Sequence, residues 1–292
     1  MTKIIFKLRF VFVLFLLAQA GCSGLVKTRV KVPENERLLP AKDATADDLF
    51  QGLQEKSKQI ETLKGTMTVE FSKGGAKTGV LDEYRETKGY VAVERPSHIR
   101  IQVQAPIVLS TLAIMVSDGQ EYRLSIPIKS QYAVEDINAP ISTDNSLSNL
   151  RPSIFLDALF VDVMPYVDKP NVKVGFEEAV VGTHSYYVFS FYDISDSSFL
   201  KAKEKIWIDR TDLEVGKKQI FGKDGRLEEE VEYEDYTNVT GISYPKVINL
   251  HRPVEDFSVK MTFQQTTMNE KLEEKLFELP RPDGYKIVRL TK

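Results

Sequence analysis

The chain has 292 residues, of which 28% are charged and 42% hydrophobic, the proportions of a globular protein, and a formal net charge of −3. A slightly acidic chain lacks the excess of Lys and Arg that nucleic-acid binding needs, so no nucleic-acid partner is expected. Its single cysteine excludes a disulfide within the chain.

The first 21 residues have the layout of a bacterial export signal. Three positive charges lie within residues 1–9, and an uncharged apolar run follows over residues 10–18. This run is too short to cross a bilayer, which takes about 20 apolar residues. Small residues then lead to the only cysteine, Cys22. Removing residues 1–21 takes away three positive charges and leaves a mature chain with a formal net charge of −6.

The sequence Ala20-Gly21-Cys22 at the end of this run resembles the lipobox of bacterial lipoproteins. The resemblance implies a diacylglycerol on the Cys22 sulfur, cleavage before this residue and acylation of the new amino group. Gln19 departs from the pattern, which usually has Leu there. The alternatives are an ordinary cleaved signal and an uncleaved membrane anchor. Two or three acyl chains anchor a protein firmly to a membrane, and Ser23, in place of an aspartate, favours the outer membrane.

The mature chain begins with a polar stretch over residues 22–44, which we interpret as the lipidated cysteine and a flexible tether. Residues 45–292 are expected to form one domain. Its first element is an amphipathic helix over residues 46–62, with Thr45 as the N-cap. The apolar residues on one face of this helix are Leu49, Leu53, Ile60 and Leu63.

From residue 64 the apolar period changes to two, which is typical of strands with one buried face. A second helix, apolar on most of its circumference, is expected over residues 153–163. Turn signals every 8–14 residues or so favour an antiparallel meander. The expected strands are 64–71, 80–93, 98–104, 111–116, 121–126, 131–134, 172–176, 184–192, 204–209, 214–221, 227–236, 242–250 and 258–266.

Several segments, in their order, resemble the lipoprotein-localisation (LolA/LolB) superfamily. They are Lys64–Phe71, Arg95–Arg100, the turn at Asp118-Gly119 and Leu276–Pro280. The resemblance covers about residues 45–285 and favours a divergent branch of lipoproteins over either named carrier. It implies an α+β, mainly β fold, in which a large curved antiparallel sheet, an incomplete β-barrel, has helices covering its open concave side. The concave face would hold acyl chains.

The resemblance also implies a lipid-binding role for the second helix, whose apolar side chains would line the mouth of the cavity. Ordinary core packing is the alternative for all of them. These residues are Phe155, Leu156, Leu159, Phe160 and Val163.

Two further sites follow from the resemblance. Pro106 is expected to break a strand, which would place the residues after it in a connection. In the receptor-type member of the superfamily, an exposed apolar residue in a loop of this region delivers lipid to the membrane. We assign that role to Val108 and Leu109, with a continued core strand as the alternative. Arg95 and Arg100 would contact the second helix, which would act as a lid over the cavity, or a lipid head group. The alternative is that both lie on the solvated face of the sheet.

No motif nominates an enzyme. His98, His184 and His251 stand far apart, and the chain has no zinc motif, nucleophile elbow or phosphate-binding loop. We therefore expect no catalysis, no metal and no cofactor apart from the covalent lipid on Cys22.

The predicted function is that of a periplasm-facing lipoprotein anchored in the outer membrane. It would bind acyl chains of a lipid or lipoprotein and act in their localisation. The alternative is a non-carrier periplasmic sensor or envelope-complex subunit that uses the same fold to bind a protein. An apolar cavity of at least several hundred cubic ångströms would favour the carrier, and a filled interior with an apolar patch elsewhere would favour the alternative.

Overall fold

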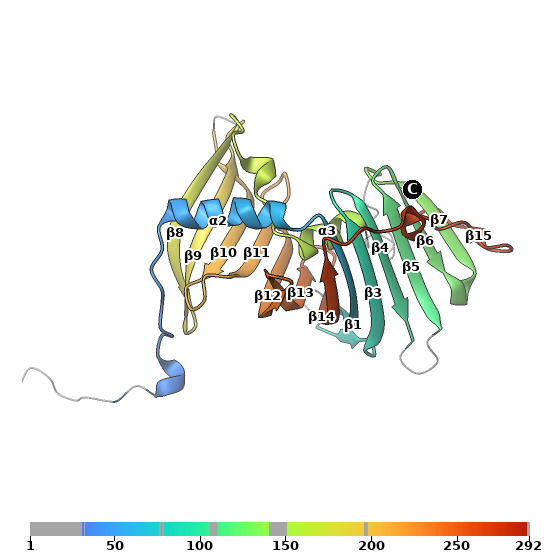
Figure 1. Ribbon diagram of the computed structural model, residues 1–292, viewed down its shortest axis with the longest axis horizontal. Coiled ribbons are helices and arrows are strands. Elements are labelled where there is room, and N and C mark those ends of the chain that lie inside the picture. Colours follow the sequence, from blue (N-terminus) through green and yellow to red (C-terminus); the bar gives the residue numbers. More distant parts are fainter. Residues whose placement is uncertain are drawn as a thin grey trace, which may run out of the picture. The chain divides into compact units, whose positions relative to one another are not determined.

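The computed structural model describes residues 31, 33–75, 77, 79–105, 110–139, 151–195 and 198–290. The chain divides into two units at Leu38. In the first unit the described part is a short 3-10 helix, η1 (Glu34–Glu36). The second unit holds the sheet and the helices that pack on it (Figure 1). Throughout the described ranges, every helix is too short or too polar to cross a membrane.

The described part of the second unit contains one sheet of 15 strands. Its first strands are β1 (Thr62–Gly74), β2 (Leu81–Glu83), β3 (Thr87–Glu94), β4 (His98–Gln104), β5 (Thr111–Asp118), β6 (Glu121–Ile126) and β7 (Gln131–Asp136). The others are β8 (Val172–Val181), β9 (His184–Asp193), β10 (Lys201–Asp209), β11 (Val215–Phe221), β12 (Leu227–Val239), β13 (Ile242–Arg252), β14 (Phe257–Met268) and β15 (Lys286–Ile287). The helices are α2 (Ala46–Gln59), α3 (Pro152–Leu159), η2 (Pro127–Lys129), η3 (Met164–Tyr166) and η4 (Glu274–Phe277).

The strands follow one another in the order β15-β7-β6-β5-β4-β3-β1-β14-β13-β12-β11-β10-β9-β8, and β2 pairs with β1 outside this path. Neighbours are antiparallel except β15, which runs parallel to β7. The sheet does not close on itself, because β8 and β15 are its two edges. The predicted fold class, a large antiparallel sheet left as an incomplete barrel, is confirmed.

The contacts of α3 establish that the sheet is curved. This helix contacts both β5 and β13, which are five positions apart in the strand order. In a flat sheet they would be separated by about 24 Å, at about 4.8 Å per strand. A helix about 10–12 Å wide reaches both only if the sheet bends around it. The helices therefore cover the inner, concave face.

Each face of the sheet has its own apolar cluster. The inner face carries the main core, which includes Leu63, Val91 and Ile248 together with residues of α2 and α3. The outer face carries a smaller cluster of Val116, Tyr132, Phe277 and Leu279. Because side chains alternate along a strand, neighbours such as Met115 and Val116 serve opposite clusters. We call residues 269–285, which supply part of the outer cluster, the strap.

Helix α2 begins as predicted, but it ends earlier than residue 62. The Thr45 side chain accepts a hydrogen bond from the Asp48 amide at 3.1 Å, so the predicted N-cap is confirmed. At the other end, Asn269 donates to the Gln59 carbonyl and accepts from the Glu61 amide, both at 2.8 Å. This side chain satisfies the last carbonyl of the helix and the first amide of the extended chain, which ends α2 at Gln59.

Several other predicted elements differ from the structure in their bounds, such as the strand expected over residues 172–176, which continues to Val181. The strand expected over residues 80–93 is divided, because β2 pairs only with β1 and β3 begins at Thr87. The second helix ends at Leu159 and not at residue 163. Phe160 is already extended, and the chain beyond it is held by side chains from other elements.

Candidate functional site

The candidate site is the second helix and its continuation, residues 152–163, which we call the α3 segment. Of the five side chains predicted to bind lipid, four are buried in the main core, and Leu156 is partly buried against it. Leu159 and Val163 are 2% and 0% exposed. In this form of the protein the five residues therefore pack against the sheet as core side chains do.

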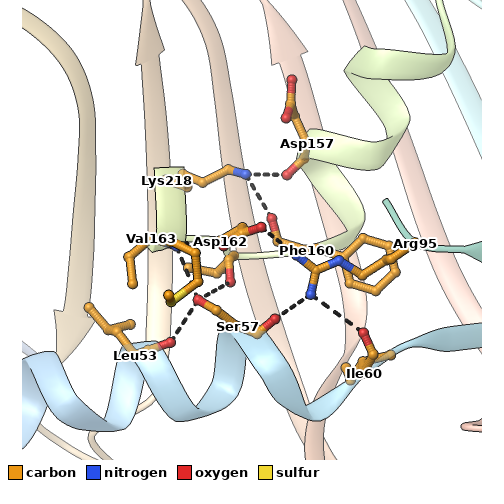
Figure 2. Close-up of polar contacts among 11 residues, drawn as sticks. Leu53, Ser57, Ile60, Arg95, Asp157, Phe160, Asp162, Val163 and Lys218 are labelled. Carbon is orange, nitrogen blue, oxygen red and sulfur yellow. Dashed lines mark hydrogen bonds and ion pairs between the residues drawn. The ribbon is translucent and has the colours of Figure 1, made fainter. Parts of the chain in front are cut away.

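The end of α3 is held by polar side chains that reach it from the sheet. Lys218 of β11 donates to the carbonyl oxygens of Asp157 and Phe160, the latter at 2.9 Å (Figure 2). The Tyr244 hydroxyl of β13 donates to the Leu159 carbonyl at 3.1 Å. These carbonyls have no partner within the helix, and a cation at a helix C-terminus is favourable for the helix dipole.

The other side of the α3 segment is bound to α2 through one hydroxyl group. The Val163 amide donates to Ser57 Oγ at 3.0 Å, and Ser57 Oγ donates to the Leu53 carbonyl at 2.8 Å. Ser57 is buried at 3% exposure, so its polar atom needs these partners. Figure 2 shows the hydroxyl between the helix and the α3 segment.

Arg95, in the turn between β3 and β4, contacts both helical elements. Its guanidinium donates to the Ser57 carbonyl, to the Ile60 carbonyl at 3.4 Å and to the Asp162 carboxylate (Figure 2). It also lies 5.2 Å from the centre of the Phe160 ring. Arg95 thus contacts the α3 segment itself. We call the side chains of Ser57, Arg95, Lys218 and Tyr244 the clasp.

Two hollows border the clasp, and Arg95 and Phe160 line both of them. The first, the apolar cavity, has a volume of about 50 Å³ and is lined mainly by apolar and aromatic side chains. These include Leu159, Val215, Tyr233, Tyr236 and Ile242. Pockets that hold small molecules have volumes of about 300–1,000 Å³. The hollow that we expected for a hydrocarbon chain is therefore too small in this form, because α3 fills the concave face.

The second hollow, the polar pocket, has a volume of about 160 Å³. Glu204 of β10 lines it and is only 5% exposed. Its Oε2 accepts a hydrogen bond from the Tyr166 hydroxyl at 2.9 Å, whereas its Oε1 has no partner among the residues described. Burial raises the pKa of Glu204 to about 7, because a carboxylate loses its hydration there.

Arg100 lies on the other face of the sheet, away from the α3 segment. Its guanidinium donates to the carbonyls of Leu276 and Glu278, at 3.2 and 3.4 Å. Tyr132 reinforces this contact by donating to the Leu279 carbonyl at 2.7 Å. Arg100 therefore holds the strap against the outer face, on the side of the sheet away from the α3 segment.

The remaining predicted site residues, Cys22, Val108 and Leu109, lie outside the described residues. His184 and His251, to which no role was assigned, make separate local contacts: His184 Nδ1 is 2.5 Å from Asp209 Oδ2, and His251 Nδ1 is 2.8 Å from Ser258 Oγ. Within the described part of the chain, no three residues among His, Cys, Asp and Glu are grouped as metal ligands would be.

Sequence reasoning missed Ser57, Lys218, Tyr244 and Glu204. For Glu204 a signal was present, because strand periodicity places it on the same face as Ile206 and Ile208, which are 0% and 2% exposed. A carboxylate in a core position is costly without a partner, so it marks a site of interest. The sequence offered no comparable signal for Ser57.

Comparisons with known proteins were made at the levels of sequence and structure. No family model matches the chain, and no curated protein matches its sequence. Among solved structures, a LolA superfamily protein from Nitrosomonas europaea is 13% identical, with a TM-score of 0.50, and the match covers 81% of this chain and 99% of that one. A DUF1329 family protein from Desulfovibrio piger is 14% identical, with a TM-score of 0.51 and coverage of 79% and 95%.

A putative outer membrane lipoprotein-sorting protein domain from Vibrio parahaemolyticus is 10% identical, with a TM-score of 0.50 and coverage of 79% and 94%. At such identities the likeness concerns the fold alone. All three matches extend over nearly the whole of the other chain. The protein described here therefore has the fold of the LolA superfamily.

Proposed function

We propose that this chain is an envelope lipoprotein that binds the acyl part of an amphiphile between its curved sheet and the α3 segment. The structure is then the closed form. In the open form, the α3 segment moves away and leaves the apolar inner face of the sheet to the ligand. The observation that carries the proposal is that Arg95 and Phe160 line both an apolar cavity and a polar pocket.

This arrangement suits a molecule with a hydrocarbon tail and a polar head. Tail methylenes gain about 0.8 kcal/mol each when they leave water, so a chain sheltered over most of its length gains on the order of 10 kcal/mol. The gain must offset the cost of lifting the buried apolar side chains of the α3 segment, which include Ile154, Phe155, Leu159, Phe160 and Val163. Each contributes about 1.5–3 kcal/mol through burial, so the gain from the acyl chain and the cost of opening are of similar size.

The mode of attachment of the α3 segment supports its role as a lid. The clasp acts mainly on backbone carbonyls and one amide of the segment. Such bonds are exchanged for bonds to water when the segment leaves, so each neutral bond costs about 0.5–1.5 kcal/mol net and each bond from the Lys218 ammonium about 1.5–3 kcal/mol. A short helix held in this way can open without unfolding the sheet.

The export signal supports an envelope location, with the membrane anchor on Cys22. An acylated cysteine would keep the domain at a membrane surface, where lipids and other lipoproteins are within reach. The Vibrio parahaemolyticus neighbour is named for outer membrane lipoprotein sorting, and we extend that role to this chain as part of the proposal.

Photocrosslinking in a bacterial host tests the proposal. A photoreactive amino acid in place of Phe160 should give adducts with lipid or lipoprotein acyl chains. The same group in place of Ile114, which packs under the strap on the outer face, is the matched control and should give none. An absence of acyl adducts at position 160, in protein with native stability, would overturn the proposal.

A filled interior with an apolar patch elsewhere is the arrangement that favours the alternative function, the binding of a protein partner. This second candidate function rests on β8. This strand of ten residues is an edge of the sheet. Val174, Phe176, Val180 and Val181 expose 41–60% of their surface on it. An exposed apolar edge can pair with an added strand. The same crosslinking group in place of Val180 should then give protein adducts, and lipid adducts at 160 would be absent if this were the main function.

A further inference from the structure

The polar pocket has a charge pattern that indicates what it binds. Its charged lining residues are two cations, Arg95 and Lys218, and three acids, Asp157, Asp162 and Glu204. Asp162 is paired with Arg95, and the Lys218 ammonium is bound to two backbone carbonyls. Glu204 is left as the buried acid without a cationic partner in contact.

The free oxygen of Glu204 is the strongest indication of a ligand. The side chain is 5% exposed, and Oε1 has no hydrogen-bond partner in the described part of the protein. A buried polar atom without a partner costs about 1–3 kcal/mol, and more when it is charged. Among the side chains of the described residues that have such an atom, Glu204 is the one that lines the polar pocket, where a ligand could supply the missing partner. Burial also raises the pKa of Glu204 to about 7, because the charge of Lys218 and the bond from Tyr166 offset the loss of hydration only in part.

The pocket also offers a donor. Lys218 is 3% exposed and carries three N–H donors, of which two bind the carbonyls of Asp157 and Phe160. The third remains for an acceptor on the ligand. A volume of about 160 Å³ equals that of about five water molecules, at about 30 Å³ each, which is enough for a small head group.

We propose that the polar pocket binds the primary ammonium group of an amphiphile, with Glu204 as the carboxylate that receives it. Phe160 and Arg95 border both hollows, so once the α3 segment has moved, a head group bound at Glu204 would continue into an acyl tail on the apolar inner face of the sheet. The inference rests on the proposed function and names the class of its ligand. Two sources supply this chemistry: an aminoalkyl phosphate head group of a phospholipid, and the free N-terminal amine of a diacylglyceryl-cysteine protein.

The test measures lipid extraction by the full chain from vesicles that contain equal parts of phosphatidylethanolamine, phosphatidylcholine and phosphatidylglycerol, with native mass spectrometry of the bound lipid. The ethanolamine ammonium can donate to Glu204, whereas the trimethylated choline ammonium cannot. We expect at least a tenfold preference for phosphatidylethanolamine over phosphatidylcholine. A second arm compares a diacylglyceryl-cysteine peptide with a free amine and its N-acetylated form. Preference for the free amine in this arm alone would assign the site to lipoproteins.

Glu204→Gln keeps the shape of the side chain and an acceptor for Tyr166, but removes the charge. This substitution should bring the ratio of extracted phosphatidylethanolamine to extracted phosphatidylcholine close to one, while the total amount of bound lipid stays the same. Glu229→Gln is the matched control, because Glu229 is also a buried acid with an unpartnered oxygen, at 1% exposure, but does not line the pocket. It should keep the preference of the natural protein.

The outcomes separate the two proposals. Equal extraction of all lipids, together with equal binding of both peptides, would overturn the ammonium site and leave the acyl-binding function standing. Extraction of no lipid and binding of no peptide would overturn both. If Glu204→Gln does not fold, the natural protein still tests the ammonium site. Its binding of phosphatidylethanolamine is then compared with its binding of the forms that carry one and two N-methyl groups. Binding should fall with each methyl group, and a flat series would refute the site.

Discussion

Replacement of Arg95 by alanine is expected to loosen the α3 segment without unfolding the sheet. The substitution removes the guanidinium bonds to the carbonyls of Ser57 and Ile60, the pair with Asp162 and the contact with the Phe160 ring. All of these join the α3 segment or the end of α2 to the turn between β3 and β4. None of them lies within the ladder of the sheet.

The size of the effect follows from the exposure and geometry of these contacts. The side chains of Arg95 and Asp162 are 20% and 31% exposed, so their pair contributes no more than about 1 kcal/mol. The bond from the charged guanidinium to the Ser57 carbonyl adds about 1.5 kcal/mol. The cation–π contact at 5.2 Å adds about 0.5 kcal/mol. The bond to Ile60, at 3.4 Å, adds little.

The contacts with the α3 segment itself, those with Asp162 and Phe160, sum to about 1–1.5 kcal/mol, which corresponds to an increase of roughly 5- to 13-fold in the opening of the segment. Hydrogen exchange measures this opening at the Phe160 amide, which donates to the Leu156 carbonyl at 3.2 Å. In the Arg95→Ala protein this amide should exchange faster by that factor. Amides of the central strands β1 and β14 should keep their protection.

Arg210→Ala is the matched control for this experiment. Arg210 lies 4.6 Å from the Tyr187 ring and pairs with Asp43 and Glu178, so it makes similar contacts away from the α3 segment. Its loss should leave the exchange of Phe160 unchanged. Unaltered exchange of Phe160 in Arg95→Ala, or an equal acceleration throughout the sheet, would refute the idea that Arg95 holds a separately opening segment.

Three other predictions concern the core, the strap and the buried acid. Leu159→Ala should lower the free energy of unfolding by about 2–5 kcal/mol in urea titrations, because the side chain is fully packed; a loss under about 1 kcal/mol would contradict that packing. Tyr132→Phe removes the bond to the Leu279 carbonyl, so it should cost about 1 kcal/mol and speed proteolysis within residues 269–285, while an unchanged cleavage pattern would speak against a strap held by this bond. The pKa of Glu204 is about 7 in the folded state, above its ordinary value of 4.5, so the folded state binds this proton more tightly than the unfolded state does. The contribution of this group to stability is therefore lost as the pH rises from about 4.5 through 7. Glu204→Gln should remove up to about 1.4 kcal/mol per pH unit of that slope between pH 5 and 7, and an identical slope in both proteins would disprove the assignment.

The regular elements of this protein could be predicted from the sequence because their signals are local. Thr45 and Asp48 mark a helix start within four residues, and the structure has the predicted cap. Asp118 and Gly119 mark a hairpin turn, in which the Asp118 carboxylate accepts from the amides of Gln120 and Glu121 at 3.0 and 2.9 Å. In each case the residues that define the geometry are close neighbours in the chain.

The candidate site was only partly predictable. The apolar pattern of residues 153–163 identified a segment that must be covered on most sides, and the structure buries it. The pattern did not reveal that the segment would fill the concave face and leave an apolar cavity of about 50 Å³. Cavity volume depends on how side chains from several strands meet the helix, and periodicity carries no information on that fit.

The sequence by itself thus determined most of the strands, the start of the first helix and the alternation between the two faces of the sheet. Only the tertiary structure decided where α2 ends, since Asn269 lies more than 200 residues away, and which carbonyls Lys218 reaches. It also decided that Arg95 faces the α3 segment while Arg100 holds the strap. The physical reason is the curvature of the sheet, which brings distant residues together through contacts that no short stretch of the chain encodes.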